Sequence, residues 1–234
     1  MFATLVIPIC IIIGVLVYKF VLGAAENFID NNPENLPKQG NVMGMAYKGG
    51  FIVPILMGML LMVFVFSIER FIVIGKATGK GSLDAFVKKI QAFLSAGNIE
   101  AATAECDKQE GSVANVIKSG LKKYREVEGD SNLDVEQSAL AIQKDIEEAT
   151  SLEMPMLEQN LTIIATLVSV GTLMGLLGTV TGMIKAFAGL SNSGAPDQAQ
   201  LAIGISEALI NTATGIATST LAIIMYNVFT SKIQ

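Results

Sequence analysis

Four long apolar stretches constrain this chain more than any other feature of its sequence. Each is close to or longer than the roughly 20 predominantly apolar residues that a helix needs to cross a bilayer. They cover residues 2–22, 49–74, 159–184 and 208–231. The sequence therefore predicts an all-α polytopic membrane protein with four transmembrane helices and, between the second and third, a helical domain of ordinary polarity.

These stretches divide the chain into segments that differ in composition. The predicted transmembrane helices occupy 1–23, 49–74, 157–190 and 201–234, and the last range includes a short tail. The predicted connections are an outward-facing linker at 24–48, a helical cytoplasmic region at 75–156 and an outward-facing loop at 191–200. The first stretch could instead be a signal peptide, since Gly23 and Ala25 satisfy a small-x-small cleavage rule. It lacks a basic region before its apolar run, which favours a retained, additional helix.

Basic residues predict the orientation. Arg70, Lys76 and Lys80 cluster just after the second stretch, and the region up to Lys144 is rich in lysine, whereas the loop Ser191–Gln200 has neither Lys nor Arg. Because positive residues stay on the cytoplasmic side, we expect the long middle region and both termini to be cytoplasmic.

Composition excludes several classes of function. The chain is 51% hydrophobic and 16% charged, carries a net charge of −5 and contains no histidine. Histidine-ligated metals, histidine bases and Ser–His triads are thereby excluded, and the negative charge does not suit a nucleic-acid binder. Cys10 lies in an apolar stretch and Cys106 in the polar region, so both are predicted to be free thiols.

The middle region shows the periodicity of amphipathic helices. One helix is predicted to begin after Ser82 and to close at Gly97-Asn98, and a second to end near Gly129. A third starts near Asn132 and continues toward the third apolar stretch, with a kink or join at Pro155. The acidic pairs of this region are interpreted as solvated helix faces.

Small residues form a stripe on each of the last two apolar stretches. At 3.6 residues per turn the third stretch aligns Gly171, Gly175, Gly178, Gly182 and Gly189, and the fourth aligns Gly204, Ala208, Gly215, Ser219 and Ala222. Such stripes indicate helices whose backbones approach closely. Thr172 and Thr179 flank the first stripe, one heptad apart, and Thr212 flanks the second.

A polar edge accompanies the second stripe. It consists of Glu207, Asn211, Thr214 and Thr218, spaced i, i+4, i+7 and i+11. A single threonine in a membrane helix often only bonds to the preceding turn or to a neighbouring helix. The whole edge, with its glutamate and amide, is typical of a surface that faces a partner or a water-filled path. Apart from Glu207, near an outer end, these stretches contain no Asp or Glu, so a complete proton path would need a carboxylate from another chain.

Three motifs resemble those of a known family. The segment Leu161–Ile184 contains GLLGTVTGM, Gly204–Gly215 reads GISEALINTATG, and Tyr226-Asn227 follows. From Gly49 to the C-terminus the chain is similar to the MotA/TolQ/ExbB proton-channel family, and most similar to its ExbB/TolQ branch. The resemblance implies a homopentamer in the bacterial inner membrane, around an ExbD- or TolR-like dimer of single-span chains whose aspartate carries the proton. Such assemblies couple the ion gradient, H⁺ or Na⁺, to work on a periplasmic partner such as a TonB-like protein.

The resemblance also assigns site residues. The family's two pore threonines correspond to Thr179 and Thr212, and its glutamate near the pore corresponds to Glu207. We expect Asn211, Thr214 and Thr218 to extend this ion path, and no cofactor to be needed. Two family prolines are absent, because Thr172 and Leu221 stand at their positions, and the first apolar stretch is additional to three-span ExbB and TolQ.

Three other functions are weighed against a force-generating channel subunit. A membrane scaffold that recruits a cytoplasmic partner would use the threonines only structurally. An independent solute transporter is disfavoured by the missing internal carboxylates and by the lack of an evident inverted repeat. An enzyme is least expected, because the sequence offers no base–nucleophile or metal constellation.

Overall fold

A computed structural model describes residues 2–129, 134–191 and 198–233, and within these ranges the named elements are all helices. Four helical stretches are long and apolar enough to cross a membrane, which confirms the predicted all-α polytopic architecture. The helices are α1 (Phe2–Val17, extended by a π-helical turn over Tyr18–Leu22), α2 (Val42–Tyr47), α3 (Ile52–Ala77), α4 (Leu83–Ser95), α5 (Ile99–Gln109), α6 (Gly111–Glu128), α7 (Val135–Glu158), α8 (Leu161–Ser191) and α9 (Gln198–Ile233).

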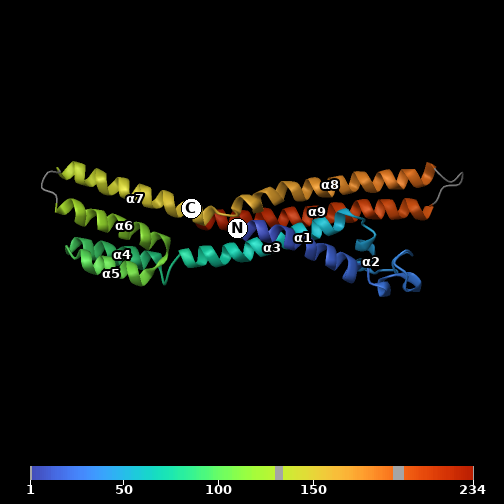
Figure 1. Ribbon diagram of the computed structural model, residues 1–234, viewed down its shortest axis with the longest axis horizontal. Helices are drawn as coiled ribbons and strands as arrows, with labels where there is room; N and C mark the ends of the chain where they lie inside the picture. Colours follow the sequence, from blue (N-terminus) through green and yellow to red (C-terminus); the bar gives the residue numbers. More distant parts are fainter. Residues whose placement is uncertain (1, 130–133, 192–197, 234) are drawn as a thin grey trace. The chain divides into compact units, whose positions relative to one another are not determined.

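The chain forms two compact units, and the first holds most of the apolar helices. It comprises residues 2–68 and 160–228, with α8 and α9 side by side along their length (Figure 1). The additional helix α1 crosses α3 at Gly14 and Gly58: a Cβ on Gly14 would come within 2.5 Å of the Pro54 carbonyl oxygen. Glycine is needed at this crossing because the two backbones touch.

A folded connection joins α1 to α3. Phe28 is fully buried there, and Tyr18 and Tyr47 stack with ring centroids 4.7 Å apart. The Lys48 ammonium donates to the carbonyl oxygens of Pro33 and Glu34 at 2.9 and 3.0 Å. Burial lowers the pKa of Lys48, and the charge of Glu34 partly opposes that shift. The segment 24–48, predicted only as a linker, is therefore an ordered structure built against the ends of both helices.

The second unit comprises residues 69–159 and 229–233 and contains the helices of the polar region. Its core is a cluster of buried residues from α4, α5 and α6: Phe86, Ile90, Ala102, Cys106, Ala114 and Leu121. Both cysteines are free, as predicted. Burial raises the pKa of the Cys106 thiol, so it behaves as a core residue and not as a reactive one.

This unit contains one helix, α5, that was not predicted from periodicity. Asn98 does follow the end of α4, but its side chain also accepts a bond from the Ala101 amide at 3.0 Å and so caps a further helix, α5. The predicted start near Asn132 lies outside the described residues, as does most of the predicted loop Ser191–Gln200. Helix α7 begins with a capping box formed by Asp134 and Gln137.

The join before α8 lies at Asn160 and not at Pro155. Pro155 is accommodated inside α7, which continues to Glu158. Asn160 then takes a left-handed conformation with φ of +67°, which asparagine tolerates better than most residues.

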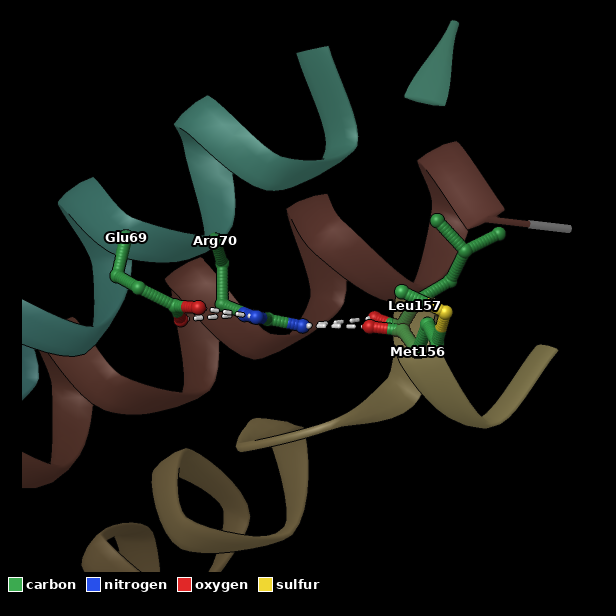
Figure 2. A network of polar contacts seen from close by, with 4 residues as sticks. All are labelled: Glu69, Arg70, Met156 and Leu157. Carbon is green, nitrogen blue, oxygen red and sulfur yellow. Dashed lines mark hydrogen bonds and ion pairs between the residues drawn. The ribbon is translucent and has the colours of Figure 1, made fainter. Parts of the chain in front are cut away.

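A buried arginine caps the C-terminal end of α7 (Figure 2). Arg70, only 1% exposed, binds the carboxylate of its neighbour Glu69 through Nε, at 2.5 Å, and through Nη2. Its Nη1 donates to the carbonyl oxygens of Met156 and Leu157, each at 3.2 Å. These carbonyls have no intrahelical partner because they lie in the last turn, and a cation is favoured at this end of a helix. Arg70 therefore fixes α3 to the end of α7.

Candidate functional site: the α8–α9 pair

Glycines allow α8 and α9 to touch along their backbones. A Cβ on Gly175 would lie 3.1 Å from the Asn211 carbonyl oxygen, and one on Gly215 would lie 2.7 Å from the carbonyl oxygen of Gly171. Nearer the C-terminal end of α8, a Cβ on Gly182 would lie 2.7 Å from the Ala208 nitrogen. The described glycines of both stripes are buried in this contact: Gly171, Gly175, Gly178, Gly182, Gly189, Gly204 and Gly215.

Two pairs of hydroxyls bridge the helices beside this line of backbone contact, which we call the seam. The Thr172 hydroxyl donates to the Ser219 hydroxyl at 2.9 Å. One heptad further along each helix, the hydroxyls of Thr179 and Thr212 are in direct contact. Thr179 also donates to the carbonyl oxygen of Gly175 at 3.2 Å. Because the helices are antiparallel, the same heptad spacing on both places the two pairs in register.

The two threonines that the resemblance assigns to the pore are thus brought together. Thr179 and Thr212 are both partly exposed, so their hydroxyls form one polar spot on an otherwise apolar surface. A hydroxyl both donates and accepts, so the spot can bind a carboxyl group in its neutral or its ionised form. The Val168 carbonyl oxygen, 3.3 Å from Thr172 Oγ1, is an alternative acceptor for the same hydroxyl proton.

The polar edge of α9 lies mostly inside this chain. Glu207 is 3% exposed, and Asn211 and Thr218 are fully buried. Thr214 donates to the carbonyl oxygen of Ile210 at 2.8 Å, and Thr218 to that of Thr214 at 2.9 Å. These two hydroxyls are therefore satisfied by their own helix, whereas Glu207 and Asn211 bind other elements.

Glu207 and Asn211 hold the turn that precedes α3. The Asn211 amide donates to the Gly49 carbonyl oxygen at 2.9 Å. Gly50 has φ of +79°, and a Cβ there would overlap the Glu207 carboxylate. Neither glycine was singled out from the sequence, although a Gly-Gly pair at the start of an apolar run is a recognised signal for a tight turn.

A lysine pairs with the glutamate. Lys185 of α8 donates to Glu207 Oε1 at 2.6 Å. Lys185 follows directly after the third apolar stretch, 159–184, and was not among the predicted site residues. A signal was present in the sequence, because one charged residue lies near the C-terminal end of α8 and one of opposite sign near the N-terminal end of α9. Two opposite charges at similar membrane depth indicate a pair.

The helices α8 and α9 therefore carry several hydroxyl side chains but only one carboxylate. Helix α8 contains no Asp or Glu, and α9 contains only Glu207, which Lys185 neutralises. A proton that crosses the apolar layer beside Thr179 and Thr212 needs a carboxylate that is not on these helices. The hydroxyls of Thr179 and Thr212 are groups that can donate to or accept from such a carboxyl group.

Comparison with known proteins identifies the family of this chain. A profile of the MotA/TolQ/ExbB proton channel family matches residues 108–234. The Tol-Pal system protein TolQ of Pseudomonas aeruginosa is 28% identical over 153 residues, which are 65% of this chain and 66% of that protein. A putative biopolymer transport protein, ExbB-like 3, of Synechocystis is 35% identical over 88 residues, 37% of this chain and 42% of that one.

A further relative matches over more of this chain. A putative ExbB homolog of Methanothermobacter thermautotrophicus is 25% identical over 196 residues, 83% of this chain and 65% of that protein. In each of these three comparisons the aligned part is less than two thirds of the relative's own length. The family profile, by contrast, covers more than half of this chain and includes all of α8 and α9. The chain therefore belongs to the MotA/TolQ/ExbB proton channel family.

Proposed function

We propose that this chain is the channel-wall subunit of an energising complex in the bacterial inner membrane. Five copies surround single-span partner chains of the ExbD or TolR kind, and an aspartate on the partner carries the ion. The complex couples the proton-motive force to work on a periplasmic process such as TonB-dependent transport. The middle region and both termini lie in the cytoplasm.

The contact between Thr179 and Thr212 carries this proposal. It places two hydroxyls at a partly exposed position between helices whose one carboxylate, that of Glu207, is paired with Lys185. In an apolar layer a partner's carboxyl group has few other polar groups to bind. In the proposed pentamer the Thr179 and Thr212 hydroxyls of the five copies form a ring. These hydroxyls can hydrogen-bond the partner's carboxyl group whether it is neutral or ionised, so the partner can turn inside the ring without leaving a charge unpaired.

The test replaces each hydroxyl by a methyl group of the same size. We expect Thr179→Val and Thr212→Val to lower partner-dependent proton flux about tenfold each, because one hydrogen bond is worth roughly 1–1.5 kcal/mol and about 1.4 kcal/mol is a factor of ten in rate. The measurement is acidification of liposomes that contain the chain with its partner, followed by a pH-sensitive dye.

Thr166→Val and Thr220→Val are the matched controls. Both threonines lie on the same two helices and are exposed away from the seam, so their replacement is expected to leave flux unchanged. The scaffold alternative makes a different prediction: the unmodified chain with its partner would show no partner-dependent proton flux, so Thr179→Val and Thr212→Val would change nothing. That result, in variants that still bind the partner, would reject the proposed ion path.

A further inference from the structure

A hollow of about 360 Å³ lies in the second unit, where α5 meets α6. The described residues that line it carry no carboxylate, and half of them are basic: Thr103 of α5, and Asn115, Lys118, Ser119, Lys122 and Arg125 of α6. The three basic residues are spaced i, i+4 and i+7 along α6, so they share one face of the helix. The hollow therefore gathers positive charge in a chain whose net charge is −5.

The neutral polar groups of the hollow already have partners. The Ser119 hydroxyl donates to Asp145 Oδ2 of α7 at 2.7 Å, and the Asn115 amide donates to Glu153 Oε1 of the same helix at 3.0 Å. The Thr103 hydroxyl donates to a carbonyl of its own helix. These bonds join α6 to α7 and engage the two α7 carboxylates, so the donors left for a ligand in the hollow are the basic groups.

The three basic groups are held only loosely. Lys118 pairs with Asp107 of α5, but the two side chains are 47% and 57% exposed. Arg125 approaches the Glu100 carboxylate only to 3.7 Å, which is too far for a hydrogen bond. Lys122 makes no hydrogen bond or ion pair with another residue of the described ranges. Exposed ion pairs contribute little to stability, so a stronger anion can replace these carboxylates at small cost.

A phosphate group matches these donors. It carries about 1.5 to 2 negative charges near pH 7 and offers three acceptor oxygens. A guanidinium group binds two phosphate oxygens at once, and an ammonium group binds as a compact charge. A volume of about 360 Å³ is near the lower end for ligand sites. The hollow thus suits a small phosphate compound, or the head group of a larger one.

We propose that this hollow is an anion site that binds a phosphate group through Lys118, Lys122 and Arg125. The phosphate is carried by a small soluble compound or by the head group of an anionic lipid, because the three cations recognise the chemistry that both share. Binding replaces the exposed pairs with Asp107 and Glu100 by charge-assisted hydrogen bonds to the phosphate oxygens. The site is built from residues of the second unit alone, so it does not depend on the proposed function.

Calorimetric titration of the full chain with inorganic pyrophosphate tests the site. The protein is held at constant ionic strength in maltoside micelles, which contain no phosphate. We expect saturable binding of one pyrophosphate per chain. Lys122→Met and Arg125→Met are each expected to lower the affinity at least about tenfold, since each removes a charge-assisted hydrogen bond. Both side chains are exposed, so the variants are expected to fold as the unmodified chain does.

Lys123→Met is the matched control. Lys123 is the neighbour of Lys122 in α6, but it pairs with Glu126 at 3.1 Å and does not line the hollow. Its replacement removes the same charge and is expected to change the affinity by less than about twofold. Equal losses from Lys122→Met and Lys123→Met would show a general attraction to a basic helix and would overturn the proposal.

Two additions to the micelles identify the source of the phosphate. Phosphatidylglycerol adds lipid phosphate, and an equal charge of cholesteryl hemisuccinate adds carboxylate without phosphate. Loss of pyrophosphate binding with phosphatidylglycerol alone assigns the site to a lipid head group, and unchanged binding with both assigns it to a soluble compound. Equal weakening by both, or no binding of pyrophosphate to the unmodified protein, would reject phosphate recognition. Neither result changes the flux expected for the Thr179 and Thr212 variants.

Discussion

At the scale of single residues, Gly50 is constrained both by its own backbone conformation and by the charged side chain that packs on it. Its φ of +79° belongs to the left-handed region, and the space where a Cβ would stand is filled by the Glu207 carboxylate. A non-glycine residue in this conformation costs about 1–2 kcal/mol before any collision is counted. The residue is therefore held by two independent requirements, one from its own backbone and one from the ion pair that packs on it.

We expect Gly50→Ala to destabilise the protein by about 2–4 kcal/mol, since it adds backbone strain and displaces a buried carboxylate from its lysine. Unfolding by increasing SDS in mixed micelles, followed by circular dichroism, measures the change. Gly75→Ala is the matched control, because Gly75 lies in α3 with nothing within 4 Å of the added Cβ. There alanine is expected to stabilise the helix by up to about 1 kcal/mol, and equal effects at both positions would contradict this account.

The sequence predicted which residues share a helix face but not what that face contacts, and the reason is physical. Helical periodicity states which residues share a face, and it correctly placed Glu207 and Asn211 on one edge of α9. It does not state whether that edge meets another chain or this one. The partner of Asn211 is the Gly49 carbonyl, 162 residues away in the sequence, and no local pattern contains that information.

At the scale of elements, the apolar helices were predictable and one polar helix was not. The length of an apolar run fixes a membrane helix because the bilayer has a fixed thickness. Helix α5, with the sequence IEAATAECDKQ, contributes mainly small side chains to the core, among them Ala102 and Cys106. Such residues give little contrast between the faces of a helix, so periodicity did not reveal it.

The arginine cap is an element-scale feature that can be tested directly. We expect Arg70→Met to destabilise the protein by about 3–5 kcal/mol, because it leaves two helix-end carbonyls and the Glu69 carboxylate without their buried partner. The readout is the rate of limited proteolysis within residues 69–159.

Arg125→Met is the control for the cap. Arg125 is 46% exposed and approaches Glu100 only at 3.7 Å, so its removal is expected to cost less than about 1 kcal/mol. A protease-resistant Arg70→Met protein would show that the cap does not hold the end of α7.

At the scale of the whole molecule, the chain forms two units that differ in composition: the first holds most of the apolar helices, and the second holds the helices of the polar region. The family profile begins within the polar unit and runs through both α8 and α9. Helix α1 and the ordered connection 24–48 precede it, so they are additions to the part of the chain that the profile recognises. Sequence alone predicted the additional helix, but the ordered connection depends on contacts between residues far apart, such as Lys48 with Pro33.

The proposed assembly makes a prediction at the same scale. We expect native mass spectrometry of the chain, purified with its single-span partner, to give five copies of this chain in each complex. A carboxylate carrier needs a closed wall of hydroxyls around it, which one copy cannot form. A different stoichiometry would require a different arrangement of Thr179 and Thr212 around the ion path.

The backbone contact between α8 and α9 also limits how this protein can move. Sliding one helix along the other by a single residue, about 1.5 Å, would carry neighbouring side chains toward places that only Gly175 and Gly215 can occupy. The two pairs of hydroxyls would break in the same step. Helices that interlock in this way are expected to move as one rigid pair and not to slide along each other. Any force that reaches one member of the pair is therefore delivered by both.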